Sequence, residues 1–150
     1  MTTARENMEK VFRERGRADA LALQARSATM DGTALNAESE KIPAFSAAIQ
    51  VKNMLDRQVG FVCKSSAGRV VRLIQPYDSD IFPSEPEELP AQWGFAWSQN
   101  PWHALPFIAL ATSPYNKGDC CTEDGKTYQS TRDGNVFPPS EYPDGWEVIV

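Results

Sequence analysis

Cysteine and histidine, which supply most structural zinc ligands and many catalytic groups, are few: three cysteines, Cys63, Cys120 and Cys121, and one histidine, His103. A structural zinc site needs four such ligands, and these four lack CxxC or HxxxH spacing. A Ser-His-Asp triad would have only His103 to use. The adjacent pair Cys120-Cys121 closes only a small strained ring, so no disulfide framework is expected. The sequence therefore predicts no catalytic residues, no metal and no cofactor.

Composition and charge exclude further classes of function. Fifteen Lys and Arg against twenty Asp and Glu give a net charge of −5, which argues against binding to nucleic acid. A hydrophobic content of 41% is enough to build a folded core. No apolar run approaches the roughly 18 residues of a membrane span. The N-terminus has no hydrophobic signal-peptide segment, so neither a membrane partner nor export is expected.

The N-terminal part of the chain reads as a helix followed by a linker. Residues 3 to about 28 are predicted to be helical, because Thr3 and Glu6 have the spacing of a capping box. A narrow stripe follows at three- and four-residue steps, with Arg15 interrupting it: Met8, Val11, Ala18, Ala22 and Ala25. Such a helix either packs on its own domain or attaches the protein to a larger assembly. Residues 29–42 are polar and are predicted to be a linker.

From residue 43 the pattern changes to short β runs punctuated by Gly, Pro and Asp. Residues 60–64 and 69–74 flank a Ser-Ser-Ala-Gly turn and predict one hairpin. Residues 119–122 and 126–131 predict a second hairpin, with Asp-Gly as a strong turn signal. A strand after the first hairpin would present three alternating aromatic residues on one face: Trp93, Phe95 and Trp97.

The two hairpins belong to a degenerate internal repeat. Each unit has, in order, a glycine, a cysteine three residues later, a second glycine, a Phe-Pro pair, a proline and a tryptophan. These landmarks are Gly60, Cys63, Gly68, Phe82-Pro83, Pro90 and Trp93, then Gly118, Cys121, Gly125, Phe137-Pro138, Pro143 and Trp146. The predicted fold class is mainly β with an N-terminal α-helix and two small tandem β modules. The predicted organisation is helix and linker (1–42), first unit (43–97), an aromatic, Pro-rich connector (98–112) and second unit (113–150).

Both units resemble carbohydrate-binding module family 5/12, the chitin-binding-type β domains. The second unit carries the more specific motifs: Tyr115-Asn-Lys-Gly118-Asp, Gly125-Lys-Thr-Tyr128 and Tyr142-Pro-Asp-Gly-Trp146. In the first unit, Leu73 to Ser79 looks like the family's loop after the hairpin, and Leu89-Pro-Ala-Gln-Trp93 looks like its closing segment. The resemblance covers about residues 45–97 and 113–150.

The resemblance implies roles for individual aromatic residues. The closing tryptophans, Trp93 and Trp146, are similar to the one that fills the small core of the family. Phe82 and Phe137 hold the place of its sugar-facing aromatic residue, and a benzene ring offers less area and a weaker quadrupole than indole. Weak binding is therefore expected, with more of it in the second unit, since Arg57 replaces the opening aromatic residue of the first. The implied carbohydrate-binding residues are Phe137, Tyr142, Tyr128, Phe82 and Tyr77.

Some of these residues have a second interpretation. Tyr128 also fits a half-buried core tyrosine, and Phe82 or Phe137 also fits a core residue or an interface anchor. The connector segment Trp97-Ser-Gln-Asn-Pro-Trp-His103 either packs between the modules or forms a protein interface, where Trp is common.

These expectations combine into one functional hypothesis. Modules of this kind are common in short bacteriophage and prophage proteins, and a virion protein needs no signal peptide because lysis releases it. We therefore expect a non-enzymatic, tail- or fibre-like virion protein whose modules bind cell-wall or surface polysaccharide during host adsorption. Other virion proteins and further copies of the chain are the expected partners of the N-terminal helix. The alternative is a purely structural virion or adaptor protein that uses the modules for protein contacts, and an accessory domain of a chitinase-like enzyme is a weaker third possibility.

Overall fold

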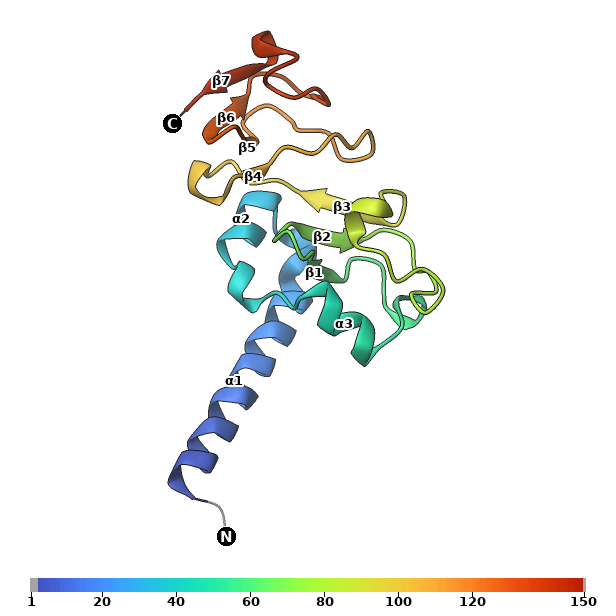
Figure 1. Ribbon diagram of the computed structural model, residues 1–150. Helices are drawn as coiled ribbons and strands as arrows, with labels where there is room; N and C mark the ends of the chain where they lie inside the picture. The colour runs from blue at the N-terminus through green and yellow to red at the C-terminus, as the bar shows by residue number, and fades with distance from the viewer. Residues whose placement is uncertain (1–2, 150) are drawn as a thin grey trace.

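The computed structural model describes residues 3–149, in which a projecting N-terminal helix leads into two β units stacked one on the other (Figure 1). The helices are α1 (Ala4–Arg26), α2 (Gly32–Ala37) and α3 (Phe45–Val51). The first sheet contains β1 (Val62–Lys64), β2 (Val70–Leu73) and β3 (Trp93–Ala96). The second contains β4 (Leu105–Pro106), β5 (Cys120–Glu123), β6 (Lys126–Ser130) and β7 (Trp146–Val148).

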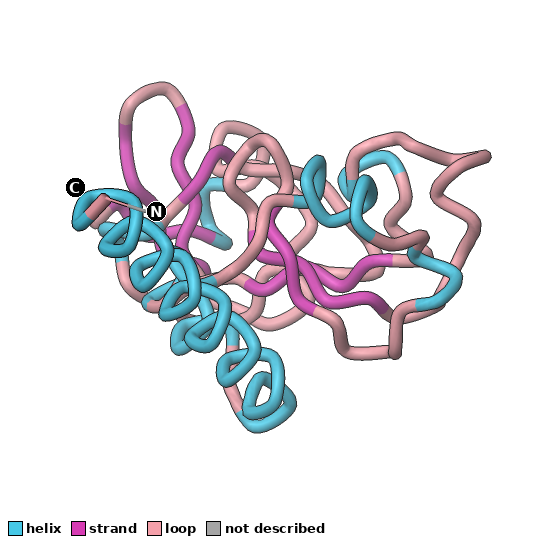
Figure 2. The backbone as a smooth tube through the Cα atoms, turned by 90° about the horizontal axis from the view of Figure 1, so that it is seen from below, coloured by secondary structure: helices cyan, strands magenta, loops and turns pink. Residues whose placement is uncertain are grey.

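The proportions of the fold differ from the sequence prediction. The N-terminal helix and the two small sheets are present, but about 37% of the chain is helical and 19% is strand, so the fold is mixed α/β rather than mainly β. Short helical segments between residues 27 and 56 account for the difference. Loops join the short strands throughout both units, as Figure 2 shows from a perpendicular direction. No helix in the described part of the chain has both the length and the apolar composition needed to cross a membrane.

The predicted capping box starts α1. The backbone N–H of Glu6 donates to Thr3 Oγ1 and the N–H of Thr3 donates to the Glu6 carboxylate, each at 3.1 Å. At the other end of α1, the Gln24 side chain donates to the carbonyl of Val62 at 2.7 Å and accepts from its N–H at 3.0 Å. A side chain thus occupies the free edge of β1, and the buried Leu23 fixes the last turns of the helix to the first unit.

The prediction of a linker over residues 29–42 is wrong. Asp31 caps α2 by accepting a hydrogen bond from the N–H of Ala34 at 2.8 Å. Leu35 and Ile42 are buried and belong to a small core with Leu23 and two sheet residues. The segment is polar in composition, but its larger apolar residues, Met30, Leu35 and Ile42, pack against Val62 and Val70 of the first sheet. The polar composition does not reveal these short helices, because each of them needs only one or two buried side chains.

The predicted hairpins are confirmed, and each is completed by a third antiparallel strand. β1, β2 and β3 pair in sequence order, and the last residue of β2, Leu73, lies opposite Trp93. β5, β6 and β7 pair in the same way, and Ser130 lies opposite Trp146. The Asp124-Gly125 turn has positive φ at both residues, 50° and 76°, as a two-residue hairpin loop requires.

The opening glycines of the two units have the same geometry. Gly60 and Gly118 have φ of 96° and 97°, where residues with a side chain are strained. The N–H of Gly60 donates to Leu73 O at 2.8 Å, and that of Gly118 donates to Ser130 O at 2.9 Å. Both units thus close the hairpin opposite their tryptophan with the same backbone contact, which agrees with the predicted repeat.

The structural repeat begins before the boundary that the sequence indicates for the second unit. β4 lies in the predicted connector (98–112), yet it pairs in parallel with β5. In the first unit Ala44 forms the corresponding parallel bridge to Lys64. The next residues also match: Phe45 meets Trp93 edge to face at 5.9 Å, and Phe107 meets Trp146 edge to face at 6.0 Å. The second unit therefore includes β4, which sequence spacing missed because the following loops differ in length.

Candidate functional site

The loop between β6 and β7 is held in place by one buried amide, Asn135. Its backbone N–H and C=O pair with Tyr115 at 2.8 and 2.9 Å. Its side-chain Nδ2 donates to Ser130 Oγ at 3.1 Å and to Gly145 O at 2.9 Å. With its exposed fraction at 2%, Asn135 ties both ends of the loop to the body of the second unit. The side chains that this loop presents to solvent therefore have a defined support.

Two aromatic side chains of this loop form a corner at the surface. The indole Nε1–H of Trp146 donates to the carbonyl of Phe137 at 2.8 Å, and the Phe137 ring is 55% exposed. The half-buried Tyr142 ring lies 6.1 Å from it at an interplanar angle of 78°. A Cβ on Gly145 would come within 2.5 Å of the Tyr142 ring, so only glycine permits this packing.

Charged groups flank the aromatic corner. The Arg132 guanidinium lies 5.5 Å from the centre of the Tyr142 ring and donates to the Tyr142 hydroxyl. The Glu141 side chain is exposed, and its carboxylate has no hydrogen bond or ion pair with any residue between 3 and 149. The resulting hollow has a volume of about 430 Å³ and is lined by Arg132, Gly134, Asn135, Phe137, Glu141 and Tyr142. We call it the Phe137 groove.

The Phe137 groove combines the two chemistries that a sugar ring requires. An exposed aromatic face can stack on the C–H groups of a pyranose. A guanidinium supplies hydrogen-bond donors and a carboxylate supplies acceptors for the hydroxyl groups. Among the predicted residues, Phe137 and Tyr142 are the two that the structure brings together. The sequence did not identify Arg132 and Glu141 as site residues, because charged residues in a turn-rich segment are equally typical of solvent-exposed turns.

The expectation that Tyr77 binds sugar is wrong. Its side chain is buried in the core of the first unit, 8% exposed, and its hydroxyl accepts a hydrogen bond from Trp93 Nε1 at 3.0 Å. Burial raises the pKa of this hydroxyl. Tyr77 therefore satisfies the polar end of a buried tryptophan, a role that a Pro-rich loop does not reveal in the sequence.

Phe82 is exposed but does not form an aromatic pair. Its exposed fraction, 54%, nearly equals that of Phe137. The residue four positions before the closing tryptophan, which is Tyr142 in the second unit, is Leu89 in the first, and Leu89 packs against the first core. Among residues 3–149 no ring contacts Phe82. The first unit therefore has a single exposed ring at the place where the second unit has the Phe137–Tyr142 pair.

The remaining predicted residues belong to the two cores. Trp93 is fully buried in the first core, and Trp146 is 6% exposed in the second, beside Tyr115 and Cys121. Tyr128 is half-buried against the second core, in line with the alternative interpretation of this residue. It does not line the Phe137 groove.

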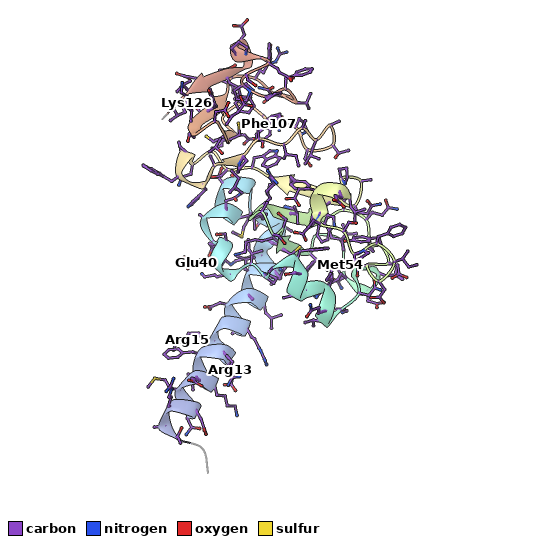
Figure 3. All side chains as sticks on the ribbon, in the orientation of Figure 1. Arg13, Arg15, Glu40, Met54, Phe107 and Lys126 are labelled. Carbon is purple, nitrogen blue, oxygen red and sulfur yellow. The ribbon has the colours of Figure 1, made fainter. Side chains whose placement is uncertain are left out.

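The connector joins the two units through stacked rings. Trp97 lies between Phe95 and Tyr115, with ring centres 5.7 and 4.3 Å away and interplanar angles of 27° and 11°. Phe107 also stacks on Tyr115, with ring centres 5.3 Å apart, and Figure 3 shows Phe107 between the units. Trp97 therefore packs between the modules as expected, whereas Trp102 is 85% exposed. A second hollow of about 560 Å³ borders Trp97, but that indole is already stacked with Phe95 and Tyr115.

The cysteines and the histidine do not converge. Cys63 and Cys121 lie in different cores, Cys120 is buried near Gln99, and His103 is exposed. Within residues 3–149 no three His, Cys, Asp or Glu side chains form a group suited to a metal ion.

The three thiols are expected to be slow to react in the folded protein. Burial raises the pKa of Cys120 to about 11 and that of Cys121 to about 12, and it also raises the pKa of Cys63. The thiolate is the reactive form, and a rise from 9.0 to about 11 lowers its fraction about a hundredfold at pH 8. Iodoacetamide at pH 8 should therefore label the native protein at least about a hundredfold more slowly than the urea-unfolded chain. Equal labelling rates, followed by mass spectrometry, would contradict this assignment.

Comparison of the chain with protein-family models, with curated proteins and with solved structures found no match. The likeness to carbohydrate-binding module family 5/12 therefore rests on the sequence motifs alone and stays a prediction.

Proposed function

We propose that this protein binds a polysaccharide without chemical turnover, and that the Phe137 groove of the second unit is the binding site. The observation that carries the proposal is the exposed corner of Phe137 and Tyr142, held against Gly145 and flanked by Arg132 and Glu141. A ring that is 55% exposed on an anchored loop is available to a ligand and loses little conformational freedom on binding.

The proposal includes an unequal division of labour between the two units. The groove of the second unit has two rings and two charged groups, whereas Phe82 in the first unit has an exposed ring alone. A single benzene face supplies little affinity. The first unit then serves mainly as a scaffold that connects α1 to the groove. A role in host adsorption, as part of a phage-type virion, remains a prediction that rests on the sequence resemblance.

In the alternative hypothesis of a purely structural adaptor, Phe137 would serve a protein contact. An adaptor would cover this ring with another protein and would not need donors and acceptors beside it. Exposure of Phe82 and Phe137 in the single chain is expected under both hypotheses, and it is the charged groups beside Phe137 that favour glycan binding.

Replacement of Phe137 by alanine should weaken retention on polysaccharide about tenfold, the equivalent of about 1.4 kcal/mol. The experiment measures binding isotherms of the purified full chain on colloidal chitin and on purified peptidoglycan sacculi. Phe82→Ala is the matched control, because it removes an equally exposed phenylalanine from the first unit. This control should retain binding within about twofold of the unmutated chain.

Circular dichroism and thermal unfolding would first establish that both variants are folded. Equal loss of binding in the two variants would contradict the assignment to the Phe137 groove. Failure of the unmutated protein to bind either polysaccharide would contradict the glycan function for these ligands, and Tyr142→Ala would then be tested for loss of protein partners instead.

A further inference from the structure

α1 has a free apolar seam that no other part of the described chain covers. Residues 3–19 are all exposed, and the helix stands clear of the two units, with Arg13 and Arg15 well away from the sheets (Figures 1 and 3). The seam follows the alternating three- and four-residue steps of a coiled coil. Its members are Ala4, Met8, Val11, Arg15, Ala18, Ala22 and Ala25. Two larger apolar residues flank it: Phe12, 60% exposed, and Leu21, 71% exposed.

The seam and the docking face lie on different sides of α1. The helix meets the sheet of the first unit through Leu23, Gln24 and Ser27. At about 100° per residue these three positions point some 150° away from the line through Met8, Val11 and Ala22. Ala22 and Ala25 accordingly stay exposed even where α1 is docked. A partner helix can therefore run along α1 from Ala4 to about Ala22. Beyond that point the ion pair between Arg26 and Glu38, at 2.7 Å, brings the first unit to the edge of this face.

Of the charges at the seam, Glu14 and Arg15 form a pair that suits a second copy of the same helix. Arg15 is the one charged residue within the seam, and Glu14 precedes it. In a parallel pair of helices, a residue at a seam position such as Arg15 lies next to the partner's residue one position earlier in the repeat. Each Arg15 would thus meet the Glu14 carboxylate of the other copy. A single polar residue within such a seam sets register at some cost in stability.

We propose that α1 is a self-association element that pairs in parallel with α1 of a second copy of this chain. Small side chains at Ala18, Ala22 and Ala25 permit close approach near the body, and Met8, Val11 and Phe12 supply most of the apolar area near the tip. Parallel pairing brings the bodies of the copies to the same end. It thereby places two Phe137 grooves in one assembly, so that weak sites act together if they bind glycans. The pairing itself does not depend on the glycan hypothesis.

The test is the mass of the full chain in solution, by light scattering on a sizing column and by sedimentation. The unmutated protein should be a dimer or higher oligomer at about 100 µM protomer. Val11→Asp should reduce it to a monomer. Arg13→Asp is the matched control, because it places an aspartate in the same turn on the opposite face, and it should leave the oligomer intact. Neither residue touches the body, so circular dichroism and thermal unfolding of the units should stay unchanged.

A charge exchange tests whether the occupant is a second copy. Arg15→Glu should raise the dissociation constant at least tenfold, because it places two carboxylates together, and addition of Glu14→Arg should restore it to within about threefold. Ala4→Cys should form an intermolecular disulfide on oxidation, as parallel pairing requires. A monomeric unmutated chain, an oligomer that survives Val11→Asp, or no rescue by the double exchange would each overturn the proposal.

Discussion

Replacement of Trp93 by alanine is expected to lower the free energy of unfolding by about 3–5 kcal/mol. Trp93 is fully buried and is the residue around which the first core is built. Phe45 and Tyr77 meet its indole edge to face at 5.9 and 6.1 Å, so truncation removes packing on two sides and leaves a cavity. The measurement is urea unfolding of the full chain, followed by tryptophan fluorescence and circular dichroism.

Tyr77→Phe separates the hydrogen bond from the packing at this site. It keeps the ring but removes the acceptor for Trp93 Nε1, which would leave a buried donor unsatisfied at a cost of about 1–3 kcal/mol. A loss below about 1 kcal/mol for Trp93→Ala would contradict the central position of this residue. Because Tyr77 is buried, a loss of glycan binding in Tyr77→Phe without loss of stability would also contradict its assignment to the core.

Replacement of Glu87 by alanine is expected to cost about 3–5 kcal/mol, because it leaves the Arg69 charge buried without its carboxylate. Glu87 accepts from Arg69 Nη1 at 2.9 Å and from Ser65 Oγ at 2.7 Å. The two charged side chains are only 10% and 15% exposed. Arg69 also donates to the carbonyl of Pro106 at 2.7 Å, so this cluster fastens the hairpin turn of the first unit to β4 of the second.

Glu88→Ala is the matched control for Glu87→Ala, because it removes the same charge from the adjacent, exposed position. It should change the free energy of unfolding by no more than about 0.5 kcal/mol. Removal of both partners in Arg69→Met/Glu87→Leu should recover most of the loss, since no unpaired charge then remains buried. Urea unfolding of the four proteins measures this, and equal losses for Glu87→Ala and Glu88→Ala would show that the buried pair does not hold the two units together.

The two units differ at the aromatic corner because of a few side chains. Tyr142 in the second unit has room to pack because Gly145 follows it, whereas Leu89 in the first unit turns into the core. The same backbone scaffold thus presents a two-ring corner in one copy and a single ring in the other. Exchange of the segments around these residues would be expected to move the groove from one unit to the other.

Local patterns in the sequence were sufficient to predict several elements. The capping box, the two hairpins and the positions of their glycines all depend on residues within a few positions of one another, and the structure bears them out. The six landmarks of the repeat also predicted two small β modules, and β1, β2 and β3 pair in the same order as β5, β6 and β7. Such signals are reliable because turn and cap geometry depends mainly on the residues that form it.

Only the tertiary structure decided which side chains are buried and which meet. Tyr77 and Phe82 are both aromatic residues in loops after the first hairpin, yet one is buried beneath Trp93 and the other is exposed. The helical segment 29–42 and the strand β4 also depend on contacts with residues far along the chain. Arg132 and Glu141 became candidate ligand contacts only when the loop folded them around Tyr142. The physical reason is that burial and convergence come from long-range packing, which neither composition nor local spacing records.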